Sequence, residues 1–229
     1  METDLLSVLA LGFLLGIKHA MEPDHVIAVS TIAGRSKKLW RSSLAGVFWG
    51  MGHSVTLFIV CMALILMKGT IPGKWALSLE FTVGLMLVYL GIVNIFSIKQ
   101  DSVLPKHFHL RKPGRINSDH ERRKVSYFQS ALVGMVHGLA GSAAMVLLSM
   151  STVRHAWEGA LYILIFGAGT VVGMFLVTTM IGIPFVLTVK KGSIHQLLTR
   201  VTGAISTCFG FYYLYHLGIT EGLFQLWIQ

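Results

Sequence analysis

Four ionisable side chains lie within seven residues near the start of the chain: His19, Glu22, Asp24 and His25. Imidazole nitrogens and carboxylate oxygens together suit a borderline divalent ion such as Ni²⁺, Co²⁺ or Zn²⁺. No cysteine lies nearby, which argues against a site for Cu(I). We therefore predict a divalent-metal site here. The alternative is a structural network in which His–Asp hydrogen bonds join two helices.

Pro23 stands in the middle of this motif. Proline has no backbone N–H and disfavours helical backbone at the preceding residue, here Glu22, so we expect the helix to be interrupted. On an unbroken helix His19 and Asp24 would point about 140° apart. The predicted break is therefore what allows these side chains to share one ion.

Two histidines further along the chain are candidate ligands. His53 lies in an apolar segment beside small residues. His137 follows Gly134 by three positions, as His19 follows Gly16. We predict both as metal-site residues, against the alternative that each is an ordinary hydrogen-bonded core histidine. Three more histidines lie in a basic polar segment and are predicted to be solvated: His107, His109 and His120.

The elements that carry these residues are predicted to cross a membrane. The chain has 229 residues, of which 54% are hydrophobic and 13% charged, whereas soluble domains have about 25% charged residues. Long uncharged stretches predict an all-α integral membrane protein. The expected spans, the first of them broken at the motif, are about six: 5–33, 43–67, 77–98, 127–151, 158–188 and 199–217. Cys61 and Cys208 fall inside spans and are predicted to be free thiols.

Most lysines and arginines fall in the connections after the first, third and fifth spans. The positive-inside rule places these connections in the cytoplasm and both termini outside, in a multi-pass protein of the cell membrane. The net charge of +9 therefore reflects topology, and we expect the partners to be lipid and metal rather than nucleic acid. Four tryptophans are predicted interface anchors: Trp40, Trp75, Trp157 and Trp227.

The chain repeats itself weakly. Gly16 and His19 match Gly134 and His137 at an offset of 118, and glycine pairs in the following spans match at offsets of 117 and 119. This pattern predicts two inverted three-helix repeats, at 1–98 and 127–229, joined by a basic cytoplasmic loop at 99–126. The repeats differ chemically, because the first holds the acids of the motif where the second has small residues.

The motif His19-Ala-Met-Glu22-Pro-Asp24-His25 resembles the His-x4-Asp-His signature of the nickel/cobalt transporter family. The segment Gly52-His53-Ser54 resembles that family's second signature. The family's third signature would fall at 165–172, where this chain lacks its acids. The resemblance is strongest to the short permease branch found with urease genes, and it implies inward transport of Ni²⁺ or Co²⁺ through the residues of these motifs.

We expect, in sum, a secondary permease rather than an enzyme, with the metal as transported substrate and no resident cofactor. No nucleotide-binding loop is present in the sequence. Three alternatives remain at this point: an intramembrane metalloenzyme that uses Glu22 or Asp24 as general base, an exporter of the same metals, and an anion carrier, which the paired carboxylates disfavour.

Overall fold

The computed structural model describes residues 2–36, 38–67, 69, 71–96, 126–152 and 156–228, and the side chains of 2–5 and 142–152 are not among them. The described residues form helices and short turns, with no strand. In chain order the elements are α1 (Glu2–His19), α2 (Pro23–Ala33), α3 (Leu39–Met67), α4 (Gly73–Phe96), α5 (Tyr127–Thr152), α6 (Ala156–Thr188), α7 (Gly192–Tyr215), the π-helical turn η2 (His216–Thr220) and α8 (Leu223–Ile228). The predicted all-α class is confirmed. The basic loop and its histidines, predicted at 99–126, lie outside the described residues except for Ser126.

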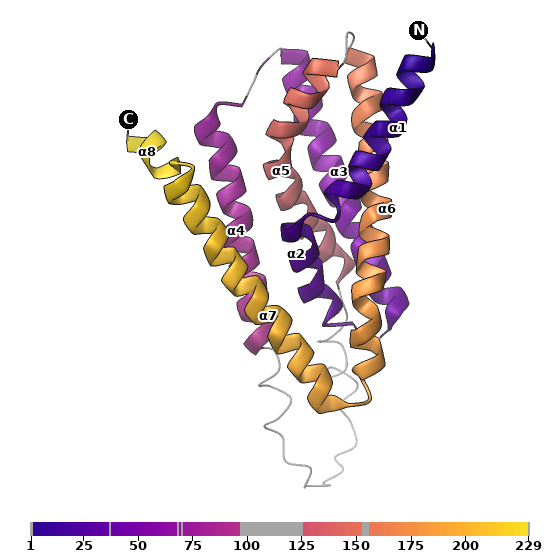
Figure 1. Cartoon of the computed structure of the whole chain (residues 1–229), viewed down its shortest axis with the longest axis vertical. Coiled ribbons are helices and arrows are strands. Elements are labelled where there is room, and N and C mark those ends of the chain that lie inside the picture. Colours follow the sequence, from indigo (N-terminus) through magenta and orange to yellow (C-terminus); the bar gives the residue numbers. More distant parts are fainter. Residues whose placement is uncertain are drawn as a thin grey trace, which may run out of the picture.

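The long helices run side by side along the longest axis, and α1 and α2 together cover one such length (Figure 1). The start of α1 and the C-terminal α8 lie at the same end of the bundle. The turn between α6 and α7 lies at the opposite end (Figure 1). This arrangement fits the prediction that both termini are on one side of a membrane.

Three helices are long and apolar enough to cross a membrane: α3, α4 and α6. The pair α1–α2 qualifies as a fourth, bent span. Helices α5 and α7 are not among the candidate spans found within the described residues; α7 starts with polar residues such as Gln196 and Arg200. A multi-pass membrane protein is therefore confirmed, and the count of six spans stays a prediction.

The predicted helix break at the motif is confirmed. Helix α1 ends at His19. The backbone N–H of Met21 donates to the carbonyl oxygen of Lys18, and that of Glu22 donates to the carbonyl oxygen of His19, so tight turns satisfy the last carbonyls of the helix. Glu22 adopts extended backbone, with φ −62° and ψ 147°, because Pro23 follows it. Helix α2 then starts with the proline in its first turn, where no N–H is needed. The two segments are bent by 56°.

Glycines bring α1 and α6 into backbone contact. A side chain at Gly16 would collide with the carbonyl oxygen of Phe166, and one at Gly169 would collide with the carbonyl oxygen of Phe13. Small residues of this kind allow close helix–helix approach in membranes, where association depends on packing rather than on the hydrophobic effect. The approach fixes the end of α1, and with it His19, against the middle of α6.

The contact between α3 and α5 has the same construction. A side chain at Gly134 would meet the carbonyl of Trp49, and one at Gly52 would meet the carbonyl of Ala131. Because a carbonyl oxygen belongs to the backbone, it cannot rotate away from an added side chain. These glycines therefore set the depth at which the two histidine-bearing helices lie against each other.

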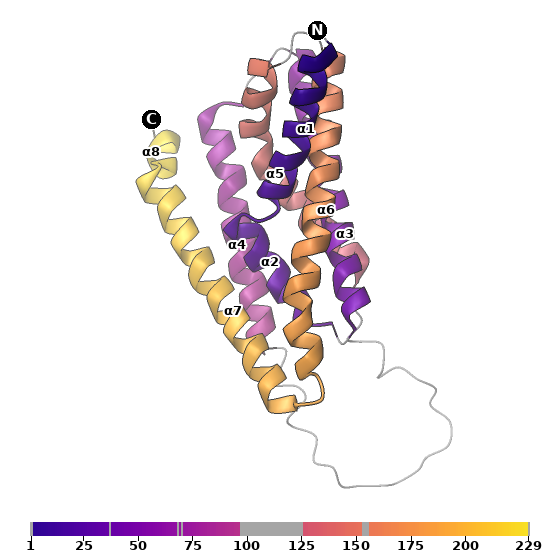
Figure 2. The same ribbon diagram turned by 45° about the vertical axis from the view of Figure 1, so that its right-hand side comes forward.

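Helices α4 and α7 form a third glycine-lined pair, in which Gly91 lies on the carbonyl of Gly203 and Gly210 lies near the carbonyl of Gly84. In both views this pair leans away from α1, α3 and α6 toward the end that carries α8 (Figures 1 and 2). Helix α2 touches both this pair and the other helices, and α4 also packs directly on α5. The fold thus consists of a four-helix scaffold (α1, α3, α5 and α6), a two-helix arm (α4 and α7), and the short helix α2 in contact with both.

Candidate metal centre

The helix break positions the motif in the middle of the bundle (Figure 1). His19 is the last residue of α1, and Asp24 and His25 lie in the first turn of α2. A carboxylate in a first turn is stabilised by the exposed N–H groups and the positive end of the helix dipole. The sequence therefore brings Asp24 to a place where the local backbone favours its negative charge.

The ring of His25 lies among the rings of the other three predicted histidine ligands. Its centroid is 4.4 Å from that of His19, 4.2 Å from that of His137 and 5.3 Å from that of His53. These four rings come from α1, α2, α3 and α5. Residues separated by more than a hundred positions in the sequence thus meet at one point.

Asp24 links His25 to His137. Its Oδ1 lies 3.0 Å from His25 Nδ1, and its Oδ2 lies 2.7 Å from His137 Nε2. Because a carboxylate only accepts hydrogen bonds, each of these ring nitrogens carries the proton and donates it. Asp24 is thus bound on both oxygens, and its side chain is 18% exposed.

His19 is held between a carboxylate and a second imidazole. Its Nδ1 donates to Glu22 Oε2 over 2.9 Å, and its Nε2 lies 3.3 Å from His53 Nε2. Glu22 is the most open of the predicted residues, with 49% of its side chain exposed. Among the described residues, it contacts the cluster through His19.

Three of the four histidines are buried and incompletely bonded. His25, His53 and His137 are each at most 2% exposed. One nitrogen of each has no partner among the described residues: Nε2 of His25 and Nδ1 of the other two. Buried polar atoms are normally satisfied, so orphaned nitrogens in one cluster point to a ligand such as a metal ion.

Two overlapping groups have the spacing that a metal ion requires. The first is His19, His25 and His53; the second is Asp24, His25 and His137. Within each group, one ligand atom from every residue lies within 4.8 Å of the others. All six predicted residues therefore lie in or beside one cluster, Glu22 at its edge. Their coordination of a metal remains a prediction.

Trp49 is a site residue that the sequence reasoning missed. It is fully buried and its ring lies nearly parallel to that of His53, 5.4 Å away at an interplanar angle of 7°. It also contacts His25 at 4.9 Å and His137 at 5.1 Å. Phe166, also buried, lies 5.4 Å from His19. The offset of 117 between Trp49 and Phe166, the same as that of the neighbouring glycines, is the signal that could have found both.

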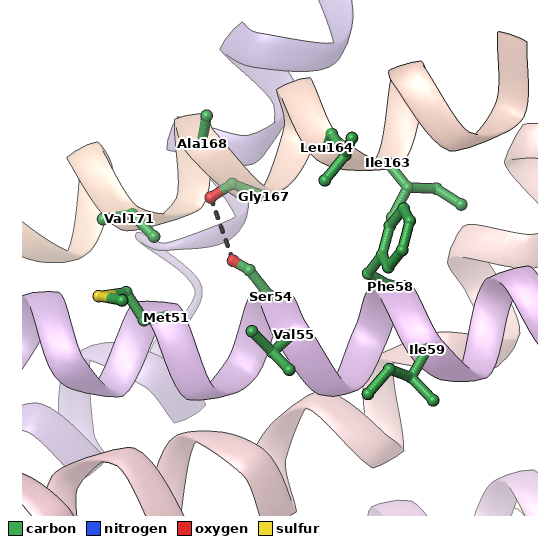
Figure 3. A pocket seen from close by; sticks show the side chains of 10 residues that line it. All are labelled: Met51, Ser54, Val55, Phe58, Ile59, Ile163, Leu164, Gly167, Ala168 and Val171. Atoms are coloured by element: carbon green, nitrogen blue, oxygen red, sulfur yellow. Dashed lines mark hydrogen bonds between the residues drawn. The ribbon is translucent and has the colours of Figure 1, made fainter. Parts of the chain in front are cut away.

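An apolar groove of about 250 Å³ lies between α3 and α6 (Figure 3). Its lining is aliphatic and aromatic apart from Ser54, whose hydroxyl donates to the carbonyl of Gly167 over 3.1 Å. None of the predicted metal-site residues lines it. It offers no ligands for a dication, so we place the functional site at the histidine cluster instead.

Residues 74–212 match a family model described as the cytochrome C biogenesis protein transmembrane region. Over its whole length the chain is 59% identical to the urease accessory protein UreH of Bacillus sp. (strain TB-90), with 100% of this chain and 99% of that protein covered.

Two plant proteins are more distant relatives. The chain is 29% identical to chloroplast protein FOR GROWTH AND FERTILITY 1 of Arabidopsis thaliana, over 75% of this chain and 48% of that protein. It is 28% identical to chloroplast protein FOR GROWTH AND FERTILITY 2 of the same plant, over 80% and 49%. The match therefore spans about half of each plant protein. No solved structure matches the chain.

Proposed function

Because the chain belongs to the UreH family of urease accessory proteins and to that of the cytochrome C biogenesis protein transmembrane region, we propose that it is a secondary transporter of Ni²⁺. The relative's link to urease and the resemblance of the motif to a nickel/cobalt signature both support nickel, with Co²⁺ as the second candidate. The ion is the transported substrate. We propose no resident cofactor and no enzymatic activity.

One observation carries the proposal: histidines from three other helices and the Asp24 carboxylate converge on His25 at a helix break in the middle of a membrane protein. Charged groups at bilayer depth are costly and therefore mark ion pathways. Neutral imidazoles replace water on the ion, and the carboxylate offsets its charge. Met21, Glu22 and Pro23 are exposed, so we propose that the irregular backbone of the break lines a water-filled path to the ion, where such backbone is tolerated at membrane depth.

The membrane potential supplies a driving force for uptake. Moving two charges through 100 mV, inside negative, releases about 4.6 kcal/mol, at about 2.3 kcal/mol for each charge. At equilibrium this free energy corresponds to a roughly thousandfold higher concentration of the ion inside than outside. Inward transport therefore needs no nucleotide. We propose that both termini face the outside of a cell membrane and that the basic connections face the cytoplasm.

The glycine contacts support an inverted repeat. The contact of Gly16 with Phe166 on α6 has its counterpart in the contact of Gly134 with Trp49 on α3. These two contacts are related by the sequence offsets of 118 and 117. The contact of Gly169 with Phe13 and that of Gly52 with Ala131 form a second such exchange. We therefore propose that α1–α4 and α5–α7 are related by a pseudo-twofold axis that passes between α3 and α6.

The repeats are interlocked, because α1 packs on α6 and α3 packs on α5. If the two sequence halves rocked against each other as rigid bodies, both of these glycine contacts would break. We propose instead that the four-helix scaffold stays fixed while the arm of α4 and α7 moves with α2. Asp24 and His25, at the start of α2, would then move relative to the scaffold histidines, which changes the access to the ion.

The function is tested by uptake of ⁶³Ni²⁺ into proteoliposomes with an imposed potential, inside negative. We expect His25→Ala and Asp24→Asn to reduce uptake to the background of empty liposomes, because each removes a group at the centre of the cluster. His216→Ala is the matched control. His216 is 40% exposed, lies in η2 and contacts Glu221 rather than the cluster, so its loss should leave uptake unchanged.

Uptake that is equal in the wild type and in His25→Ala, at equal protein content, would contradict the proposal. Uptake that disappears when the potential is removed would identify the driving force. Metal resistance rather than metal accumulation in cells that express the chain would assign it as an exporter of the same ions.

A further inference from the structure

The geometry points to two alternative coordination sets that share His25, between which the transported ion is passed. This inference rests on the proposed transport of a divalent ion and specifies its route. We call His19, His25 and His53 the imidazole set, and Asp24, His25 and His137 the carboxylate set. These are the two groups whose ligand atoms lie within 4.8 Å of one another.

The distances within each set suit one ion. A divalent ion with metal–nitrogen bonds of about 2.0–2.1 Å holds neighbouring ligand atoms roughly 3 Å apart. In the imidazole set, Nε2 of His19 and Nε2 of His53 are separated by 3.3 Å. In the carboxylate set, Oδ2 of Asp24 and Nε2 of His137 are separated by 2.7 Å. Small adjustments would let an ion replace the hydrogen bond in either pair.

Two of the three rings in the imidazole set are already oriented for binding, whereas His53, which donates from Nε2 to His19 Nε2, must first move its proton to Nδ1. Nδ1 of His19 donates to Glu22, and Nδ1 of His25 donates to Asp24. Each neutral ring therefore has its lone pair on Nε2, and that atom of His25 has no partner. A carboxylate behind a histidine fixes the tautomer and makes the ring a better ligand. In this set Asp24 holds a ligand in place and does not itself touch the ion.

The carboxylate set changes the role of Asp24 from orienting a ligand to being one. Oδ2 and His137 Nε2 would then both face the ion. The neutral ring of His137 must then carry its proton on Nδ1, which is buried and without a partner among the described residues. An ion in this set meets an anionic oxygen, whereas an ion in the imidazole set meets only neutral nitrogens.

His25 lies midway between the two sets. Its centroid is 4.4 Å from His19 and 4.2 Å from His137, which occupy equivalent positions of the repeat. The imidazole set comes entirely from the first half of the chain, whereas the carboxylate set includes α5 of the second half. A transport site must bind an ion and also release it, and several weak positions serve this better than one tight position. A shared ligand lets the ion move without losing all its protein contacts.

The test uses purified protein in detergent, with Co²⁺ as probe and its visible ligand-field absorption and dissociation constant as readouts. His53→Ala disables only the imidazole set. Asp24→Asn disables only the carboxylate set, because the Asn carbonyl still accepts the hydrogen bond from His25. His25→Ala disables both. Size-exclusion profiles and the conservative variant His53→Gln control for folding.

Because the association constants of two alternative sets add, the variant that keeps the tighter set should bind Co²⁺ within about twofold of wild type, the other should bind more weakly, and their association constants should sum to that of wild type. Their spectra should differ from each other, with the all-nitrogen ligand field in Asp24→Asn. A variant that combines His53→Ala with Asp24→Asn should bind Co²⁺ no more tightly than His25→Ala. The inference is wrong if either single variant binds as weakly as His25→Ala, or if the two variants give one and the same spectrum. If the wild type binds neither Co²⁺ nor Ni²⁺, the proposed function itself fails.

Discussion

The segment after His19 and the segment after His137 occupy equivalent places in the repeat but have different structures. After His19 the helix stops, turns and restarts at Pro23 with a bend of 56°. After His137, α5 continues without interruption through Ala140 and Gly141 to Thr152. The preceding turns pack alike, since Gly16 and Gly134 each lie on a backbone carbonyl of a facing helix.

The difference lies in what each segment contributes. The first brings two carboxylates and His25 to the centre of the molecule, whereas the second has small residues, Ala140 and Gly141, at the corresponding places. A side chain at Gly141 would come within 3.9 Å of the ring of His19, so the unbroken helix forms a close wall beside the site. A similar framework thus supports a face of candidate metal ligands on one side and a packing face on the other.

The largest loss of stability is expected at the glycine contacts that the two halves have in common. Gly16→Ala and Gly134→Ala each place a methyl group against a backbone oxygen, which cannot move aside. The cost should exceed the upper range of ordinary overpacking, about 3 kcal/mol. Thermal unfolding in detergent measures it, with Gly73→Ala as control, because a side chain there meets nothing within 4 Å. Stability in either variant equal to that of the control would remove the basis for equating the two contacts.

A second prediction concerns the proline break, which the first half has and the second half lacks. Gly141→Pro should destabilise α5 by about 3 kcal/mol or more, because the ring clashes with the carbonyl four residues earlier, which is that of His137. Pro23→Ala should leave the protein folded but weaken Ni²⁺ binding by about 10–100-fold, since α1 and α2 could then join and turn Asp24 away from His19. Isothermal titration with Ni²⁺ measures the second effect. Wild-type affinity in Pro23→Ala would show that the break does not assemble the site.

The smallest effect is expected from the aromatic residues behind the histidines. Trp49→Leu and Phe166→Leu should each cost less than the about 3–5 kcal/mol of full truncation to alanine. Trp49 contacts three histidines, whereas Phe166 contacts only His19. We therefore expect Trp49→Leu to weaken Ni²⁺ binding more and to alter the Co²⁺ spectrum more. Equal losses of affinity in the two variants would mean that these rings only fill space.

Much of the site could be predicted from local sequence. Pro23 dictates the break because of its own covalent structure, and the motif supplies four ionisable groups within seven residues. His53 and His137 were predicted from an apolar context and from the repeat, and both lie in the cluster. By contrast, Trp49 was overlooked because a tryptophan in an apolar span has the same local pattern whether it faces lipid, core or histidine.

Contacts between distant segments could not be predicted in this way. The sequence repeat predicted two three-helix halves, but not that α1 packs on α6 and α3 on α5, across the two halves. A pairing of helices depends on which glycine meets which carbonyl, and every glycine in an apolar span offers the same close approach. The count of six spans and the three-part division of the chain remain predictions.

The sequence by itself determined the membrane class, the helix break and the kinds of candidate ligand, because apolar length, proline geometry and side-chain chemistry are properties of short segments. Only the tertiary structure decided that His25 lies between His19 and His137, that Asp24 bonds to residues from both halves, and that Trp49 lies against three rings. Those relations depend on the angles and depths at which helices pack, and backbone contact at a few glycines sets them.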